Sequence, residues 1–290
     1  MDRESQPAAV RQPGDAMIKP VLDLFSNIAA LREACESCAK DPTAGAVHHL
    51  RSSVVRIQAL LRVVALLPDA PDFGRTAKRL RKATRLLRRA AGGVRDLDVH
   101  LELLRAIRAP QGQRQEAKAL MAKLEKKRAR RARKLSAEIV RRLPRLHRRL
   151  DQLEIVLAPV REGSLAQSQV LDLARSNFAS ARATLHPESP DDLHGLRKSA
   201  KISRYIAEAG TQHSAGPEGR DTARSTAQAF RRIQQAGGEW HDALLLVEEA
   251  SHTLQPASPL VDRLVHRRDA THRKAIRQLQ EGRAPQSFGP

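Results

Sequence analysis

The stretch DLHGLRKSAKISRYIAEAG, residues 192–210, is a strong helix former whose polar face is almost entirely cationic. At about 100° per residue its basic side chains fall within a third of the helix circumference, and no acid joins them before Glu208. The face consists of His194, Arg197, Lys198, Lys201 and Arg204, followed by Tyr205. A solvated helix face normally intersperses acids with bases, so this pattern indicates an anionic partner.

A second copy of this motif lies 146 residues earlier in the chain. Each copy has a histidine and an arginine three residues later. An aspartate lies 48 residues after the histidine, shortly after a glycine pair. The glycine pairs nearly coincide under the same offset, which indicates an internal duplication. The matched residues are His48 and His194, Arg51 and Arg197, and Asp96 and Asp242.

Composition and periodicity predict an all-α fold. Apolar residues make up 41% of the chain, enough for a core, while the alternating β-branched and aromatic runs typical of strands are absent. We predict two pseudo-symmetric repeats, each roughly a four-helix bundle, around a basic groove or channel. The repeats span about 17–155 and 165–282, flanked by disordered tails at 1–16 and 283–290. Breakers and periodicity place the helices at 17–40, 42–67, 72–92, 95–109 and 113–155, and at 165–186, 190–210, 219–237, 239–254 and 259–281.

Local signals set expectations for several helix ends. Asp41-Pro42 and Ser189-Pro190 each offer an N-cap residue followed by a proline at the first helical position. Pro144 predicts a kink in the longest helix. Asp96 and Asp242 follow glycines, so one interpretation makes them N-caps; in the other, each carboxylate orients the histidine or arginine of its own repeat.

The net charge of +20 is concentrated in one quarter of the chain. Residues 75–149 hold 26 Lys/Arg against 6 Asp/Glu, so this segment alone accounts for the excess. One face of helix 72–92 spans about 120° and carries six cations, whose like-charge contacts cost on the order of 1–3 kcal/mol in total. A merely solvated face is the less favoured interpretation. The six are Lys78, Arg81, Lys82, Arg85, Arg88 and Arg89.

The two halves carry their cations on different helices, which predicts one groove shared between them. Four of the six basic positions of helix 72–92 are not basic in the second repeat, and three basic positions of helix 190–210 are not basic in the first. We therefore expect these two helices to line the same groove. His48, Arg51, Arg56 and Arg62 are expected to complete it.

Other features predict a cytoplasmic protein. The N-terminal segment has no apolar signal core, and no apolar run approaches the ~18 residues of a membrane span. Cys35-x-x-Cys38 is a single pair, which favours two packed, reduced thiols over a zinc or redox site. We expect no metal and no cofactor.

These motifs together resemble the CHAD domain, the conserved-histidine α-helical domain, over about residues 17–282. AVHHLRSSVVRIQALLR (46–62) and DLHGLRKSAKISRYIAE (192–208) resemble its paired H-x-x-R helices, and LLRRAAGGVRDLDVHLELL (86–104) and QQAGGEWHDALLLVEE (234–249) resemble the segments that follow them. The resemblance implies two helical bundles around a basic channel that binds inorganic polyphosphate, and possible location at polyphosphate granules. The ligand-facing positions it implies are His48, Arg51, Arg56, Arg81, Arg85, Arg88, His194, Arg197, Lys198, Lys201 and Arg204.

Three functions are compatible with such a basic surface. A polyphosphate-binding module without chemistry fits best, because closely spaced lysines and arginines form charge-assisted bonds to successive phosphates. Non-specific binding to a nucleic-acid backbone is an alternative, although aromatic residues make up only 2% of the chain. A phosphate-processing enzyme is the third, but no Walker sequence is present. For His48 and His194 we favour phosphate contact as imidazolium over a structural hydrogen bond. Asp96, Asp242 and Tyr205 are expected to support the site.

Overall fold

The computed structural model describes residues 16–107, 110–211, 217–255 and 257–281, and this part of the chain is almost entirely helical. The all-α prediction is therefore confirmed. The tails predicted at 1–16 and 283–290 lie, apart from Ala16, outside the described residues. The helices are α1 (Pro20–Lys40), α2 (Ala44–Val64), α3 (Gly74–Ala106), α4 (Arg114–Leu157), α5 (Gln167–Thr184), α6 (Pro190–Ala209), α7 (Pro217–Ser251) and α8 (Pro259–Glu281). Short 3-10 turns at Gln111–Gln113 and Ala158–Val160 flank α4.

The glycine pairs do not end helices, which corrects the predicted boundaries. α3 and α7 each run unbroken through their glycines, so 72–92 and 95–109 form one helix, as do 219–237 and 239–254. A glycine inside a helix costs only about 1 kcal/mol, which packing on both sides of it readily offsets. The N-cap interpretation of Asp96 and Asp242 is therefore wrong, because both lie inside continuous helices.

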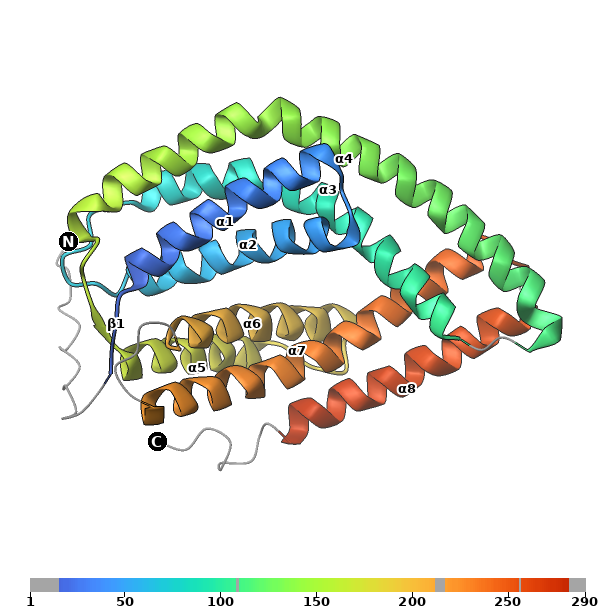
Figure 1. The fold of residues 1–290 in the computed structure, drawn as a ribbon. Coiled ribbons are helices and arrows are strands. Elements are labelled where there is room, and N and C mark those ends of the chain that lie inside the picture. Colours follow the sequence, from blue (N-terminus) through green and yellow to red (C-terminus); the bar gives the residue numbers. More distant parts are fainter. Residues whose placement is uncertain (1–15, 108–109, 212–216, 256, 282–290) are drawn as a thin grey trace.

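One of the two predicted helix starts is confirmed. Ser189 caps α6 by accepting a hydrogen bond from the Asp192 amide, and Pro190 follows as the first helical residue. The other start is wrong, since α2 is capped by Thr43, whose hydroxyl accepts from the Ala46 amide. α4 continues through Pro144 without interruption, and Figure 1 shows it as a bent arch over the molecule.

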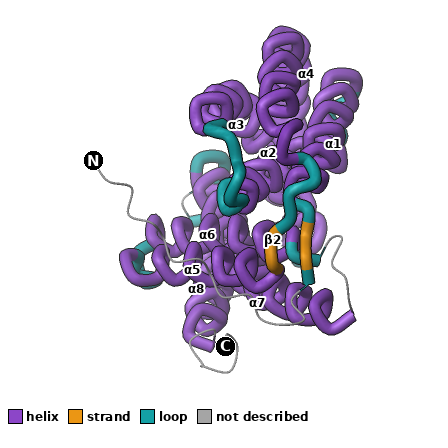
Figure 2. Tube along the Cα trace, turned by 90° about the vertical axis from the view of Figure 1, so that its left-hand side faces the viewer, coloured by secondary structure: helices purple, strands orange, loops and turns teal. Residues whose placement is uncertain are grey.

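Four helices from each half of the chain pack as a layer, within the part described. Figure 2 shows α1–α4 gathered on one side of the molecule and α5–α8 on the other. The layers meet mainly where α2 packs against α6, the two helices that carry the H-x-x-R motifs. That the two repeats superpose, and the predicted domain boundaries, stay predictions.

The principal core runs through both halves. Fully buried side chains such as Leu50 on α2, Phe178 on α5 and Phe230 on α7 belong to one continuous apolar cluster. Burying a side chain of this kind contributes about 1.5–3 kcal/mol. A two-residue antiparallel pair, β1 (Met17–Ile18) with β2 (Leu165–Ala166), also joins the start of each half. This pair was not predicted, since two residues are too few for a periodic signal.

A second, smaller core lies at the far end of the molecule. It is formed by the C-terminal ends of α3 and α7 and the N-terminal ends of α4 and α8, and it includes Leu101, Leu124, Leu246 and Leu264. The continuity of α3 and α7 makes this end possible, because each helix serves both cores. Figure 1 shows these four ends meeting away from the α2–α6 contact.

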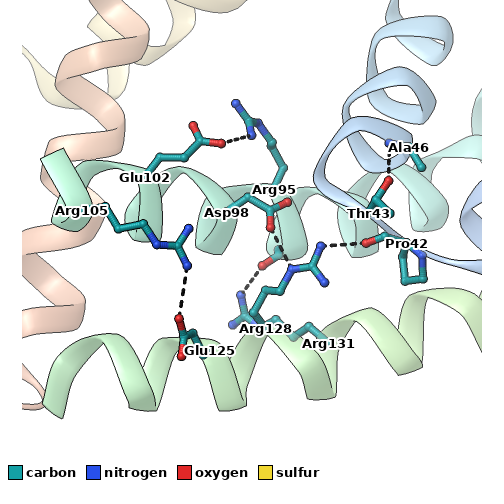
Figure 3. Close-up of polar contacts among 11 residues, drawn as sticks. Pro42, Thr43, Ala46, Arg95, Asp98, Glu102, Arg105, Glu125, Arg128 and Arg131 are labelled. Atoms are coloured by element: carbon teal, nitrogen blue, oxygen red, sulfur yellow. Dashed lines mark hydrogen bonds and ion pairs between the residues drawn. The ribbon is translucent and has the colours of Figure 1, made fainter. Parts of the chain in front are cut away.

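Arginines hold the N-terminal half of α4 against α3 (Figure 3). Arg128 bonds to Asp98 at 2.8 Å and donates to the carbonyl of Pro42 at 2.7 Å, which ties α4 to the loop before α2. Arg131 donates to the carbonyl of Gly93 at 2.9 Å. The arginines in this part of α4 therefore bond to carboxylate and carbonyl oxygens of the protein itself.

Candidate functional site

A cleft of about 580 Å³ lies between the two layers, with walls from α2, α3, α6 and α7. It contains five of the predicted site residues, and Asp96 and Asp242 also line it. It also contains Glu102 and Glu239, so the predicted basic groove is mixed in charge rather than acid-free. We name this space the central cleft. Its cationic or imidazole residues are His48, Arg51, Arg95, Arg197, Lys201, Arg204 and Arg231.

Lys201 on α6 is the most strongly perturbed cation of the central cleft. Burial, followed by the nearby Arg51, Arg197, Arg204 and Arg88, together lower its pKa to about 8. These neighbours come from both halves of the chain. No carboxylate of a described residue lies within ion-pair distance of the Lys201 ammonium. The ammonium of Lys201 therefore lies among like charges without an ion pair to any described residue.

Tyr205 organises the cations at one end of this site. Its ring is buried, with Arg204 4.8 Å, Arg56 5.3 Å and Lys201 6.0 Å from its centroid. The arginines approach the ring at distances typical of cation–π contacts, and Arg204 also pairs with Glu208 at 2.7 Å. Tyr205 thus positions basic side chains rather than offering a surface of its own.

Arg51 on α2 is held by its own repeat. One guanidinium nitrogen lies 3.3 Å from the Asp96 carboxylate and 3.3 Å from the carbonyl oxygen of Gly92. A methyl group at Gly92 would come 3.9 Å from that nitrogen, an ordinary van der Waals contact. The geometry agrees with the interpretation in which Asp96 orients the arginine of its repeat.

Arg197 on α6 occupies the matched position without a matched ion pair. Asp242 lies close enough to act on it electrostatically, but no hydrogen bond joins the two described side chains. Burial raises the pKa of Asp242, although Arg197 favours its ionised form. A Cβ at Gly237 would lie 3.1 Å from the Arg197 Cβ, so this glycine allows α6 and α7 to approach closely.

The predicted histidines are uncharged near neutral pH in the free protein. Burial, Lys198 and Arg197 lower the pKa of His194 to about 4, and burial also lowers the pKa of His48. The His194 ring lies 4.3 Å from that of His241, whose pKa is lowered to about 3 by burial and by nearby cations. Contact with phosphate as imidazolium therefore requires the ligand itself to raise these pKa values. Sequence reasoning did not commit to His241, although it is the repeat counterpart of Arg95.

The cationic face of α3 divides between two places, so the prediction of one shared groove is only partly met. Arg88 lies near Lys198 and Lys201, beside the central cleft, and lowers the pKa of both. Lys82 and Arg85 instead line a separate groove between α3 and α4. The helix turns about 100° per residue, so neighbours on a 120° face can point to opposite sides of the helix crest.

Eight predicted residues line neither the central cleft nor the groove between α3 and α4. They are Arg56, Arg62, Lys78, Arg81, Arg88, Arg89, His194 and Lys198. Arg62 contacts the Asn177 side chain, and its pKa is lowered by burial and by Arg81, which lies beside it. Lys78 and Arg89 are exposed on the crest of α3, and no described residue forms an ion pair with either. By the helix period they lie between Arg85 and Lys82, on the side of α3 that faces the separate groove rather than the cleft.

Two arginines of the central cleft were not among the predicted site residues. Arg95 lines it and pairs with Glu102 at 3.3 Å, and Arg231 contributes from α7. Arg95 was assigned to a separate helix because the glycine pair was taken as a break. Arg231 is the repeat counterpart of Arg85, and this match is the signal that could have identified it.

Other expectations concern metals, thiols and membranes. Cys35 and Cys38 are free and fully buried, and burial raises their pKa values to about 12 and about 11, as expected of packed thiols. Within the described residues, no three His, Cys, Asp or Glu side chains gather closely enough to hold a metal ion. Nor is any helix in that part of the chain both long and apolar enough to cross a membrane.

The chain was compared with known proteins. It is similar to the crystal structure of the CHAD domain from the plant Ricinus communis, with a TM-score of 0.64 and 18% identity over 94% of this chain and 91% of that one. It is also similar to PptA from Streptomyces chartreusis, with a TM-score of 0.57 and 16% identity over 89% of this chain and 99% of that one. No curated protein matches it in sequence. The CHAD domain model matches residues 23–251, and the chain therefore belongs to the CHAD domain family.

Proposed function

We propose that the central cleft binds inorganic polyphosphate and that the protein holds this polymer without transforming it. The observation that carries the proposal is the setting of Lys201, whose pKa is lowered to about 8 by burial and by four neighbouring arginines from both halves. Folding such like charges together is unfavourable unless an anion joins them. The family to which the chain belongs was expected, from the sequence motifs, to be a polyphosphate binder.

The chemistry of the cleft suits a chain of phosphates. Each guanidinium presents donors in a planar fork that matches two phosphate oxygens, while a lysine ammonium serves as a point charge. Arg197, Lys201 and Arg204 lie along one wall within two helical turns, so they can meet successive phosphates. A polymer with a charge on each repeating unit neutralises the whole row at once.

The aromatic residues favour polyphosphate over single-stranded nucleic acid. Trp240 is 3% exposed and Tyr205 6%, and every other described aromatic ring is buried or half-buried. Single strands are usually held by stacking their bases on exposed rings. A ligand that has phosphates but no bases fits this surface better.

Calorimetric titration with long-chain polyphosphate at ~150 mM salt, with duplex DNA or RNA as competitor, tests the proposal. We expect binding that excess nucleic acid does not displace, and polyphosphate that keeps its chain length after incubation. Equal displacement by DNA would reduce the cleft to a generic basic surface. Shortened or extended chains would show that the protein is an enzyme.

A further inference from the structure

The groove between α3 and α4, within the layer formed by α1–α4, is a second concentration of positive charge. It has a volume of about 150 Å³ and runs between the first half of α3 and the second half of α4, which lie side by side (Figure 1). We name it the outer groove. Its six cations are Arg79, Lys82 and Arg85 on α3 and Arg142, Arg145 and Arg149 on α4.

The charged residues that line the outer groove are all cations, unlike those of the central cleft. No carboxylate lines it, whereas four line the cleft. Of its six cations, only Arg142 has an ion pair with a described residue, Glu138, which lies four residues earlier on α4. Arg149 donates to the Gln152 side chain at 2.7 Å. The floor is apolar, so the charged ends of these side chains gather at the rim.

The N-terminal half of α4 and the part of α3 that packs against it show that this charge is not needed for packing. There Arg128 and Arg131 of α4 bond to Asp98 and to the Gly93 carbonyl of α3 (Figure 3). Towards the other end of the pair, the arginines of α4 meet the basic residues of α3 instead. Like charges three or four residues apart on a helix disfavour folding. A structural role therefore explains the contacts of Arg128 and Arg131 but not the cations of the outer groove.

The crest of α3 connects the two cavities. Arg88 lies on the side of the central cleft, and at about 100° per residue Arg85, Lys78, Arg89 and Lys82 follow it around α3 to the outer groove, with Lys78 and Arg89 exposed between Arg85 and Lys82. A flexible polyanion that leaves the cleft over α3 thus meets cations along its whole path. By the helical rise, the α3 wall of the outer groove is about 9 Å long, enough for several contacts.

We infer that the outer groove is a second subsite for the same polyphosphate chain, which makes this protein selective for long chains. The inference rests on the proposed function of the central cleft. A short oligophosphate fills the cleft alone, whereas a long chain crosses α3 and also occupies the outer groove. Joining two subsites by one ligand raises the affinity, because the second contact is intramolecular.

Arg145→Gln with Arg149→Gln tests the inference, because these residues line only the outer groove. The matched control is Arg130→Gln with Lys134→Gln, which removes the same charge at the same spacing from exposed positions of α4 without ion pairs to described residues. We expect the groove variant to lose about tenfold or more of its affinity for long-chain polyphosphate and to keep its affinity for tripolyphosphate. The control keeps both, and thermal unfolding verifies that each variant folds.

Two outcomes would overturn the inference: unchanged long-chain affinity in the groove variant, or an equal loss for both ligands. Protection of arginines from phenylglyoxal, read by mass spectrometry, gives an independent measure. Arg145 and Arg149 should be protected by long chains and not by tripolyphosphate, while Arg197 should be protected by both. Protection of Arg145 without Arg197 would contradict the proposed function and leave the outer groove as a site by itself. Protection of Arg197 alone by long chains would contradict only the second subsite.

Discussion

Helices α2 and α6 carry the same H-x-x-R motif at matched positions, yet the fold uses them differently. On α2, Arg51 is tied to Asp96 and to the Gly92 carbonyl of its own repeat. On α6, Arg197 has no such bonds and stands in a row with Lys201. The two copies of the motif therefore differ, because the arginine of α2 is tied to its own repeat and the arginine of α6 lies beside Lys201 without the matched ion pair.

The difference originates in a few side chains along the helix. The repeat counterparts of Lys201 and Arg204 are Val55 and Gln58, so α2 contributes apolar packing where α6 contributes charge. Val55 is 7% exposed and belongs to the main core. A duplicated motif thus predicts the shared framework, while the residues between its matched positions decide which copy carries the charge.

Reversing one charge on each helix breaks the comparison with the largest expected effect. Lys201→Glu should weaken polyphosphate binding about 100-fold, or about 2–3 kcal/mol, because it places an acid among the arginines that meet the ligand. Arg56 on α2 is exposed, so Arg56→Glu should lower the affinity for polyphosphate less than tenfold. Calorimetry measures both, and circular dichroism should show unchanged helix content. Equal losses would remove the distinction between the helices.

Removing the charge without reversing it sharpens the comparison through stability. The pKa of Lys201 is about 8 in the folded protein, below its ordinary value, so folding disfavours the ammonium at pH 7. Lys201→Met keeps the apolar stem and should raise the free energy of unfolding by on the order of 1–2 kcal/mol while weakening binding. Denaturant unfolding at pH 7 measures this gain. A stability loss would mean that Lys201 has a partner that supports the fold.

The glycines beside the two motif arginines offer the smallest and most local contrast. The repeat counterpart of Gly92 is Gly238, where a Cβ would lie 3.8 Å from Arg197, whereas Gly237 is the counterpart of Ala91 and is the tighter position. A Cβ at Gly92 meets Arg51 at 3.9 Å, whereas at Gly237 it meets Arg197 at 3.1 Å. Gly92→Ala should stabilise α3 by about 0.5–1 kcal/mol through helix propensity, while Gly237→Ala should gain less or nothing and weaken polyphosphate binding as Arg197 shifts. Thermal unfolding and calorimetry on both variants measure this. Identical behaviour would show that the approach at Gly237 does not position Arg197.

Much of this fold follows from the sequence, since apolar periodicity and the repeat at 146 residues predict the helices and their order. The breaks at the glycine pairs were wrong because packing at both cores outweighs a local penalty that sequence patterns treat as decisive. Of the four acids that line the cleft, Asp96 and Asp242 were predicted and Glu102 and Glu239 were not. The division of the α3 face depends on where α4 and α6 pack, which a single helix pattern does not contain.

The titration of Lys201 tests the central claim most directly. If its pKa of about 8 rises when phosphates approach, binding at pH 8 takes up roughly half a proton, and affinity falls as pH rises above 8. Calorimetry at pH 8 in two buffers of different ionisation enthalpy measures this uptake in the wild-type protein and in Lys201→Arg, which keeps the charge but does not titrate. We predict uptake in the wild type that disappears in Lys201→Arg while binding remains. The same uptake in both proteins, or none in the wild type, would contradict the account.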